Sequence, residues 1–136
     1  MLIDSYIYIP VADLEKATAW YAKNLAFRLI YKDALYYDLR TENGLKILLL
    51  PTEGNITSQM QYSTGEQPAY GFCVDDIDAI KEKLEMNGVK IGEMFNYFGR
   101  SFSFYDLDGN KIEIWEEPRP LPLRDSTAEG CPSQIY

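Results

Sequence analysis

Few side chains in this chain could do chemistry. Its 136 residues contain no histidine, and the two cysteines, Cys73 and Cys131, therefore have no imidazole to lower their thiol pKa. We do not expect a cysteine nucleophile, and we interpret both residues as free thiols. Carboxylates are the remaining reactive groups, and several gather in "FYDLDGNKIEIWEE", around Glu113. As a general base Glu113 would need a raised pKa and a substrate within reach, and the sequence indicates neither.

The charge of the chain excludes some partners. Its formal net charge is −8, whereas binding to nucleic acid requires a basic face for the phosphates. No apolar run approaches the roughly 18 residues needed to span a membrane, and the N-terminus "MLIDSYIYIPV" lacks the features of a signal peptide. We therefore expect a cytoplasmic protein without nucleic-acid or membrane partners. The surplus acid either attracts cationic small molecules or only maintains solubility.

Two segments repeat one pattern, a strand followed by a helix. The first is "YIYIPVADLEKATAWYAKNL" and the second is "AYGFCVDDIDAIKEKLEMNG". Each begins with alternating apolar residues and then changes to helical spacing. Asp13 and Asp76 are the expected N-caps, and Asn87-Gly88 ends the second helix. The apolar helical stripes consist of Leu14, Ala17, Tyr21 and Leu25 in the first segment and of Ile77, Ile80 and Leu84 in the second.

Three strand-like stretches follow each predicted helix. They read "FRLIYKD", "LYYDLRT" and "LKILLLP" in the first half, and "KIGEMFNYF", "SFSFYDL" and "KIEIWEEP" in the second. The last strand of each half follows a tight turn, Asn43-Gly44 or Asp108-Gly109-Asn110. The sequence thus predicts an α+β fold made of two βαβββ modules in one domain that spans residues 1–136. The expected parts are the modules at about 1–51 and 68–118, a linker at 52–67 and an extended tail at 119–136.

Three motifs in this order resemble a known superfamily. "VADLEKATAWYAKNLAF", "FCVDDIDAIKEKLEMNGV" and "FYDLDGNKIEIWE" are similar to motifs of the vicinal oxygen chelate superfamily, which includes glyoxalase I, bleomycin-resistance proteins and extradiol dioxygenases. The resemblance covers residues 5–117. Ala26 replaces a usual glycine and Leu107 a usual proline. The resemblance implies the glyoxalase/bleomycin-resistance fold, in which curved mixed sheets form half-barrels around a cleft.

The resemblance also implies where a metal would bind. The four ligand positions of the superfamily correspond to Tyr6, Leu48, Ala69 and Glu113, and only Glu113 is an ordinary ligand type. Leucine and alanine cannot coordinate a metal, and a divalent ion in an enzyme usually has about three protein ligands. A site rebuilt from Asp4 and Glu113 would hold magnesium weakly, mostly through water. We therefore predict no metal and no cofactor, and Glu113 is the single catalytic candidate.

The same positions define a predicted binding face. Because side chains alternate along a strand, residues of the same parity as the ligand positions should line the cleft. Aromatic rings there would stack on a ligand, and acids would meet a cation or a hydrogen-bond donor. The predicted ligand-binding residues are Asp4, Tyr6, Tyr8, Leu48, Ala69, Arg100 at the rim, Glu113 and Trp115. Residues of opposite parity should pack under the helices: Ile7, Ile9, Ile47, Leu49, Phe72, Val74, Ile112 and Ile114.

Three functional interpretations follow. The first is a small-molecule binding protein of the bleomycin-resistance type, which sequesters an aromatic or cationic compound such as an antibiotic. The second is a glyoxalase- or dioxygenase-like enzyme with an altered metal site. The third is a regulatory or interaction domain whose cleft is filled by its own side chains. The first is preferred, with catalysis not expected. Open sheet edges and the long tail favour a homodimer.

Overall fold

The computed structural model describes residues 1–118, so the predicted tail lies outside the described residues. The first module comprises β1 (Ile7–Val11), α1 (Leu14–Leu25), β2 (Arg28–Lys32), β3 (Tyr37–Arg40) and β4 (Lys46–Pro51). Its sheet has the order β1-β4-β3-β2. Strand β1 is parallel to β4, while β3 is antiparallel to both β4 and β2.

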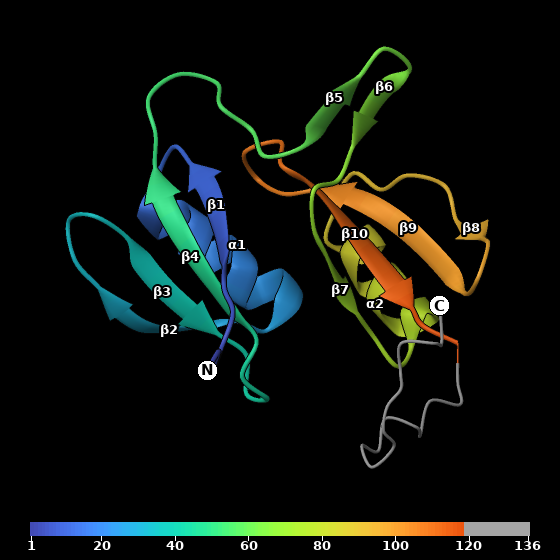
Figure 1. Cartoon of the computed structure of the whole chain (residues 1–136), viewed down its shortest axis with the longest axis horizontal. Helices are drawn as coiled ribbons and strands as arrows, with labels where there is room; N and C mark the ends of the chain where they lie inside the picture. Colours follow the sequence, from blue (N-terminus) through green and yellow to red (C-terminus); the bar gives the residue numbers. More distant parts are fainter. Residues whose placement is uncertain (119–136) are drawn as a thin grey trace.

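The second module repeats this arrangement (Figure 1). It comprises β7 (Gly71–Cys73), α2 (Ile77–Met86), β8 (Phe95–Asn96), β9 (Arg100–Tyr105) and β10 (Lys111–Glu116). Its sheet has the equivalent order β7-β10-β9-β8, again with its first strand parallel to its last. The predicted pair of βαβββ modules is confirmed. The segment predicted as a linker differs from expectation, because it contains the hairpin of β5 (Met60–Tyr62) and β6 (Gly65–Gln67).

Both helices begin where the sequence predicts. The Asp13 side chain accepts a hydrogen bond from the amide nitrogen of Lys16 at 2.9 Å, and Asp76 accepts one from Ala79 at 3.1 Å. These bonds satisfy amide groups that the first turn of a helix leaves without a partner. Helix α1 ends at Ala26, which adopts the left-handed conformation with φ 61°. Within residues 1–118 no helix is both long enough and apolar enough to cross a membrane.

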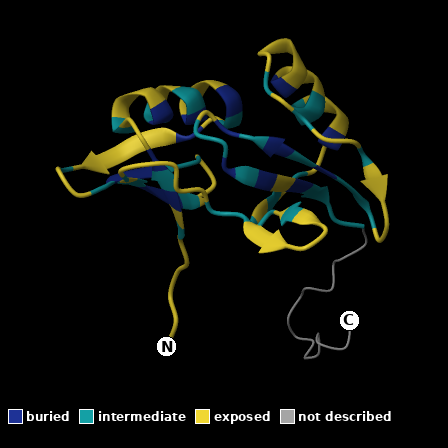
Figure 2. Cartoon of the chain, turned by 90° about the horizontal axis from the view of Figure 1, so that it is seen from above, coloured by how far each residue is buried: buried dark blue, intermediate teal, exposed yellow. Residues whose placement is uncertain are grey.

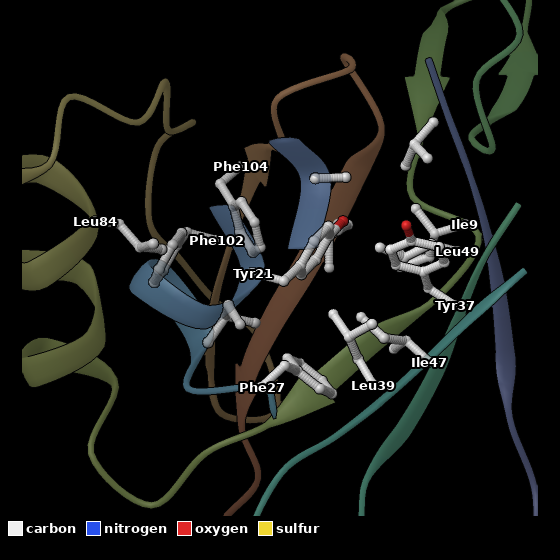
Figure 3. Close-up of a cluster of buried hydrophobic side chains, with 14 of the residues drawn as sticks. Ile9, Tyr21, Phe27, Tyr37, Leu39, Ile47, Leu49, Leu84, Phe102 and Phe104 are labelled. Atoms are coloured by element: carbon white, nitrogen blue, oxygen red, sulfur yellow. The ribbon is translucent and has the colours of Figure 1, made fainter. Parts of the chain in front are cut away.

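The core lies between the helices and one face of each sheet. The eight residues predicted to face the helices are all buried or partly buried and belong to one apolar cluster, which confirms the predicted parity. In Figure 3, Tyr21 of α1 lies between Phe102 and Phe104 of the second sheet and the aliphatic side chains of the first. One core therefore joins the two modules. Figure 2 shows both helices on the same side of the sheets, and within residues 1–118 no helix covers the other faces.

The turn between β9 and β10 ties the second module to the first. The buried Asn110 side chain donates to the carbonyl oxygen of Pro10 at 2.9 Å, and Oδ1 of Asp108 accepts from the amide of Ala12 at 2.9 Å. The Tyr21 hydroxyl donates to Oδ2 of Asp106 at 2.5 Å. Burial raises the pKa of Asp106. Burial also raises the pKa of Tyr21 well above its usual value, and the Asp106 carboxylate beside it adds to this shift. The aspartate-rich motif thus has a structural role at the module junction.

Candidate functional site

Two tyrosines mark the open face of the first sheet. Tyr6 and Tyr8 are 53% and 52% exposed, and their ring centroids lie 5.1 Å apart at an interplanar angle of 68°. Leu48 of β4 pairs with Tyr8 on one side and with Asp38 of β3 on the other, which forms a continuous row across the sheet. A hydrogen bond with Tyr6 raises the pKa of Tyr8, so the Tyr8 hydroxyl stays neutral near pH 7. The face therefore offers uncharged aromatic surface.

Acids and bases on this face neutralise each other. Arg40 donates to both carboxylate oxygens of Asp38 at 3.1 and 3.2 Å. The Lys46 ammonium lies 4.0 Å from a carboxylate oxygen of Asp4 and 5.9 Å from the ring centroid of Tyr6. Asp4 is therefore already paired within the chain. This pairing weakens the expectation that Asp4 would meet a cationic ligand.

The second sheet presents Glu113 and Trp115 on its open face. Glu113 is exposed, and within residues 1–118 its carboxylate has no hydrogen-bond or ion-pair partner. The Trp115 indole donates to the carbonyl oxygen of Phe98 at 2.9 Å, and its ring lies 6.1 Å from the Phe98 ring. Ala69 is exposed just before β7. The indole is thus held in place, whereas the carboxylate is free to meet solvent or a ligand.

Glycine 71 has a structural role on this face. A Cβ added at Gly71 would lie 2.5 Å from the carbonyl oxygen of Glu113, a distance that real side chains do not tolerate. The glycine therefore permits β7 to pair closely with β10. Its lack of a side chain is a requirement of strand pairing and not evidence of space for a ligand.

The predicted binding residues do not form one group within the chain. Tyr8 and Leu48 belong to the first sheet, and Asp4 and Tyr6 directly precede its strand β1. Glu113 and Trp115 belong to the second, separate sheet, and Ala69 precedes its strand β7. Arg100 is not at a rim shared with Glu113. Its guanidinium donates to Asp78 of α2 at 3.0 and 3.2 Å and to Glu116 at 3.2 Å. Arg100 has the parity of the buried Phe102, and its side chain therefore lies on the helix side of the sheet.

A sequence comparison identifies the family. A profile of the Glyoxalase/Bleomycin resistance protein/Dioxygenase superfamily matches residues 3–114. The chain belongs to this superfamily. A search among curated protein sequences found no significant match.

Solved structures of the superfamily share the fold. A glyoxylase/bleomycin resistance protein/dioxygenase domain from Frankia sp. EAN1pec superposes with a TM-score of 0.70 at 20% identity, covering 87% of this chain and 99% of its own. TnmS3, an antibiotic binding protein from Streptomyces sp. CB03234, gives 0.68 at 22%, with coverage of 87% and 99%. The fosfomycin resistance protein FosX from Listeria monocytogenes, complexed with Mn(II) and sulfate, gives 0.68 at 21%, with coverage of 87% and 92%. At these identities the likeness shows the fold alone.

The donor set does not fit a metal of the superfamily. Tyr6 and Leu48 belong to the first module and Ala69 and Glu113 to the second, and the side chains of Leu48 and Ala69 carry no donor atoms. In the part of the chain that the structure describes, no three histidine, cysteine, aspartate or glutamate side chains lie close enough together to hold a metal ion. Asp4 and Glu113, the pair considered above for magnesium, belong to different modules, Asp4 before β1 and Glu113 on β10.

Sequence reasoning missed part of the open face of the first sheet. Asp38 and Arg40 of β3 share it with Tyr8 and Leu48, as their pairing register shows. The signal was present in the buried neighbours Tyr37 and Leu39, whose opposite parity turns Asp38 and Arg40 outward. The sequence pattern did not predict that Asp38 would be buried and paired with Arg40.

Proposed function

We propose that this superfamily member is a small-molecule binding protein that holds a planar aromatic compound against the open face of its first sheet. The main support is the pair of half-exposed tyrosines, Tyr6 and Tyr8, on a face that no helix of residues 1–118 covers. Exposed apolar and aromatic surface of this kind often marks a binding site. Flat rings can stack on the tyrosines, next to Leu48, which is itself only 9% exposed.

The charges of the face favour an uncharged ligand. Asp4 is paired with Lys46 and Asp38 with Arg40, so the first sheet offers no unpaired charge among these four groups. Glu113 on the second sheet remains the one predicted site residue whose carboxylate could meet a cation. Aromatic stacking is therefore expected to contribute more to ligand binding than recognition of a cation.

The superfamily provides limited support. TnmS3, which shares the fold, is an antibiotic binding protein, and a similar role would suit a face without metal donors. FosX, in contrast, was crystallised with Mn(II). Because this fold hosts several chemistries, the family by itself does not decide between binding and catalysis.

A homodimer completes the proposal. The open faces of both sheets look toward the same side of the molecule, and the structure places Tyr8 and Glu113 on different sheets (Figure 2). A second copy that covers these faces could bring the first sheet of one chain opposite the second sheet of the other. Glu113 and Trp115 would then contribute to a cleft that one chain does not enclose.

The proposal can be tested with two fluorescent tricyclic probes of similar size, neutral 1-aminoanthracene and cationic proflavine. Fluorescence anisotropy titrations would compare the parent chain with Tyr8→Ala. We expect both probes to bind, the neutral one at least as tightly, and Tyr8→Ala to raise Kd about fivefold, since an aromatic pair contributes about 1 kcal/mol.

Tyr97→Ala is the matched control. Tyr97 is 90% exposed in the loop before β9 and far from the first sheet in sequence, so its loss should leave Kd unchanged. Equal effects of the two substitutions would indicate nonspecific adsorption to tyrosines. No binding of either probe by the folded protein would contradict the proposed function and favour a filled, noncatalytic surface.

A further inference from the structure

A pocket opens between the two modules, away from the open face of the first sheet. It has a volume of about 180 Å³ and is bordered by the end of α1, the turn between β3 and β4, β7 and α2. None of its lining residues is Tyr6, Tyr8, Leu48 or Glu113. The pocket is therefore distinct from the surface to which the proposed function refers.

The walls of this pocket are aromatic and aliphatic. The rings of Phe27 and Phe72 lie with their centroids 5.9 Å apart and tilted by 59°, one from each module. Ile114 of β10 is 1% exposed, and Ile80 of α2 is partly buried. Water in such a pocket finds few polar partners, so an apolar molecule of suitable size would replace it favourably.

The rim adds an apolar side chain that the turn holds in position. Leu45 is 42% exposed although it is a leucine. Its amide nitrogen donates to Oγ1 of Thr41 at 2.9 Å, and its carbonyl oxygen accepts from the Thr41 amide at 3.0 Å. These two bonds close the turn and keep Leu45 at the mouth of the pocket. A bound molecule would cover apolar area that now faces water.

Charge selects among apolar ligands. Lys83 of α2 is the only ionised side chain among the described lining residues, and no acid lines the pocket. Within residues 1–118 the Lys83 ammonium has neither an ion pair nor a hydrogen-bond partner. The neighbouring Lys81 differs, because its ammonium lies 2.9 Å from Glu85. An unpaired cation beside an apolar pocket favours an apolar ligand that carries one anionic group. This holds locally even though the net charge of the chain is −8.

We propose that this pocket binds a small aromatic monocarboxylate, with its ring between Phe27, Phe72 and Ile80 and its carboxylate at Lys83. Because the lining comes from both modules, such a ligand bridges them and stabilises their junction. The site is independent of the aromatic face of the first sheet.

The experiment uses 4-ethylbenzoate as the probe and 4-ethylbenzyl alcohol as its uncharged counterpart. Binding is measured by isothermal titration calorimetry on the full chain, and also by the rate at which N-ethylmaleimide modifies Cys73, an exposed lining residue, in a Cys131→Ser background. We expect the carboxylate to slow modification of Cys73. We expect the alcohol to bind about fivefold more weakly, as the loss of an exposed ion pair implies.

Three variants decide the outcome. Lys83→Gln should raise Kd for the carboxylate about fivefold and leave the alcohol unchanged, whereas Lys81→Gln should change neither. Ile80→Trp should fill the pocket and abolish binding of both, with circular dichroism confirming the fold. The inference is overturned if the probe does not slow Cys73 modification, or if Lys83→Gln and Lys81→Gln act alike. It is also overturned if Tyr8→Ala, which tests the other face, abolishes 4-ethylbenzoate binding.

Discussion

At the scale of single residues, Ala26 carries backbone strain at the end of α1. Its φ of 61° and ψ of 30° lie in the left-handed region, where a Cβ atom costs about 1 kcal/mol. Its amide nitrogen donates to the carbonyl oxygen of Tyr21 and closes the helix. A glycine would adopt this conformation without the penalty. The alanine is therefore a local departure from the best sequence for this turn.

We predict that Ala26→Gly raises the free energy of unfolding by about 1 kcal/mol, because the strain of the left-handed conformation is removed. Urea unfolding followed by circular dichroism would measure the change. Ala22→Gly is the matched control, since Ala22 is exposed within α1. It should lower the free energy of unfolding by about 1 kcal/mol. A loss of stability in both variants would show that Ala26 is not strained.

Tyr70 makes the free energy of unfolding depend on pH in the alkaline range. Burial raises its pKa to about 12, above the model-peptide value of 10.0, and its hydroxyl lies 2.9 Å from Oγ of Ser58. The folded state thus keeps the proton longer than the unfolded state. Its contribution is fully present below pH 10 and is lost as pH rises through the folded pKa. We predict that the free energy of unfolding falls between pH 10 and 12, by up to about 1.4 kcal/mol per pH unit for this one proton.

Urea unfolding at a series of pH values would measure that slope. Tyr70→Phe should make the slope shallower, because it removes the titrating hydroxyl. Tyr97→Phe changes a tyrosine that is 90% exposed and should leave the slope as it is. An unchanged slope in Tyr70→Phe would mean that the alkaline loss comes from other groups, among them Tyr21.

At the scale of elements, the two turns that precede β4 and β10 look alike in sequence but differ in function. Asn110 is fully buried, and its side chain bonds to Pro10, to Asp106 and to the amide of Ser58 at 2.9, 2.9 and 3.0 Å. Asn43, at the corresponding turn, is exposed and accepts one bond from the Thr41 hydroxyl. The second turn holds the modules together, whereas the side-chain bond of Asn43 stays within the first turn.

We predict that Asn110→Ala lowers the free energy of unfolding by about 3 kcal/mol or more, because several buried polar groups lose their partner. Asn43→Ala should cost less than about 1 kcal/mol, as expected for an exposed bond. Thermal and urea unfolding of the two variants side by side would measure the difference. Similar costs would contradict the assignment of the module junction to the second turn.

At the scale of the whole molecule, one core joins the modules, while no helix within residues 1–118 covers the other face of either sheet. The apolar cluster includes residues of both sheets and both helices. The opposite faces carry Tyr6, Tyr8 and Trp115, and β2 is exposed along its whole length. Covering such a surface favours association with a second copy.

We predict that the full chain sediments as a dimer of the 15.7 kDa subunit and that 1-aminoanthracene, the probe of the proposed face, shifts the equilibrium further toward the dimer. Sedimentation velocity over a range of concentrations, with and without the probe, would measure both effects. A strict monomer that still binds the probe would place the whole site on the first sheet. Glu113 and Trp115 would then have no part in it.

The sequence by itself determined the local structure of this protein. Asp13 and Asp76 cap the helices because the aspartate side chain satisfies free amides at a helix start, and this bond depends only on near neighbours. The apolar alternation likewise assigned each strand side chain to its face. The repeat and its motifs determined the family. The hairpin of β5 and β6 escaped prediction because each of its strands has only three residues, mostly exposed, and so short a stretch gives no recognisable apolar pattern.

Tertiary structure alone decided what those faces meet. Parity placed Tyr8 and Glu113 on the faces away from the helices, but only the strand pairing of the folded chain shows that these faces belong to two separate sheets. Arg100 forms an ion pair with Asp78, and Asp4 forms one with Lys46. Charged groups pair with the opposite charge that lies nearest in space, which the sequence does not show. The pocket at Lys83 arises from side chains of both modules, which no local pattern brings together. Local rules shape elements, while contacts between distant residues make the sites.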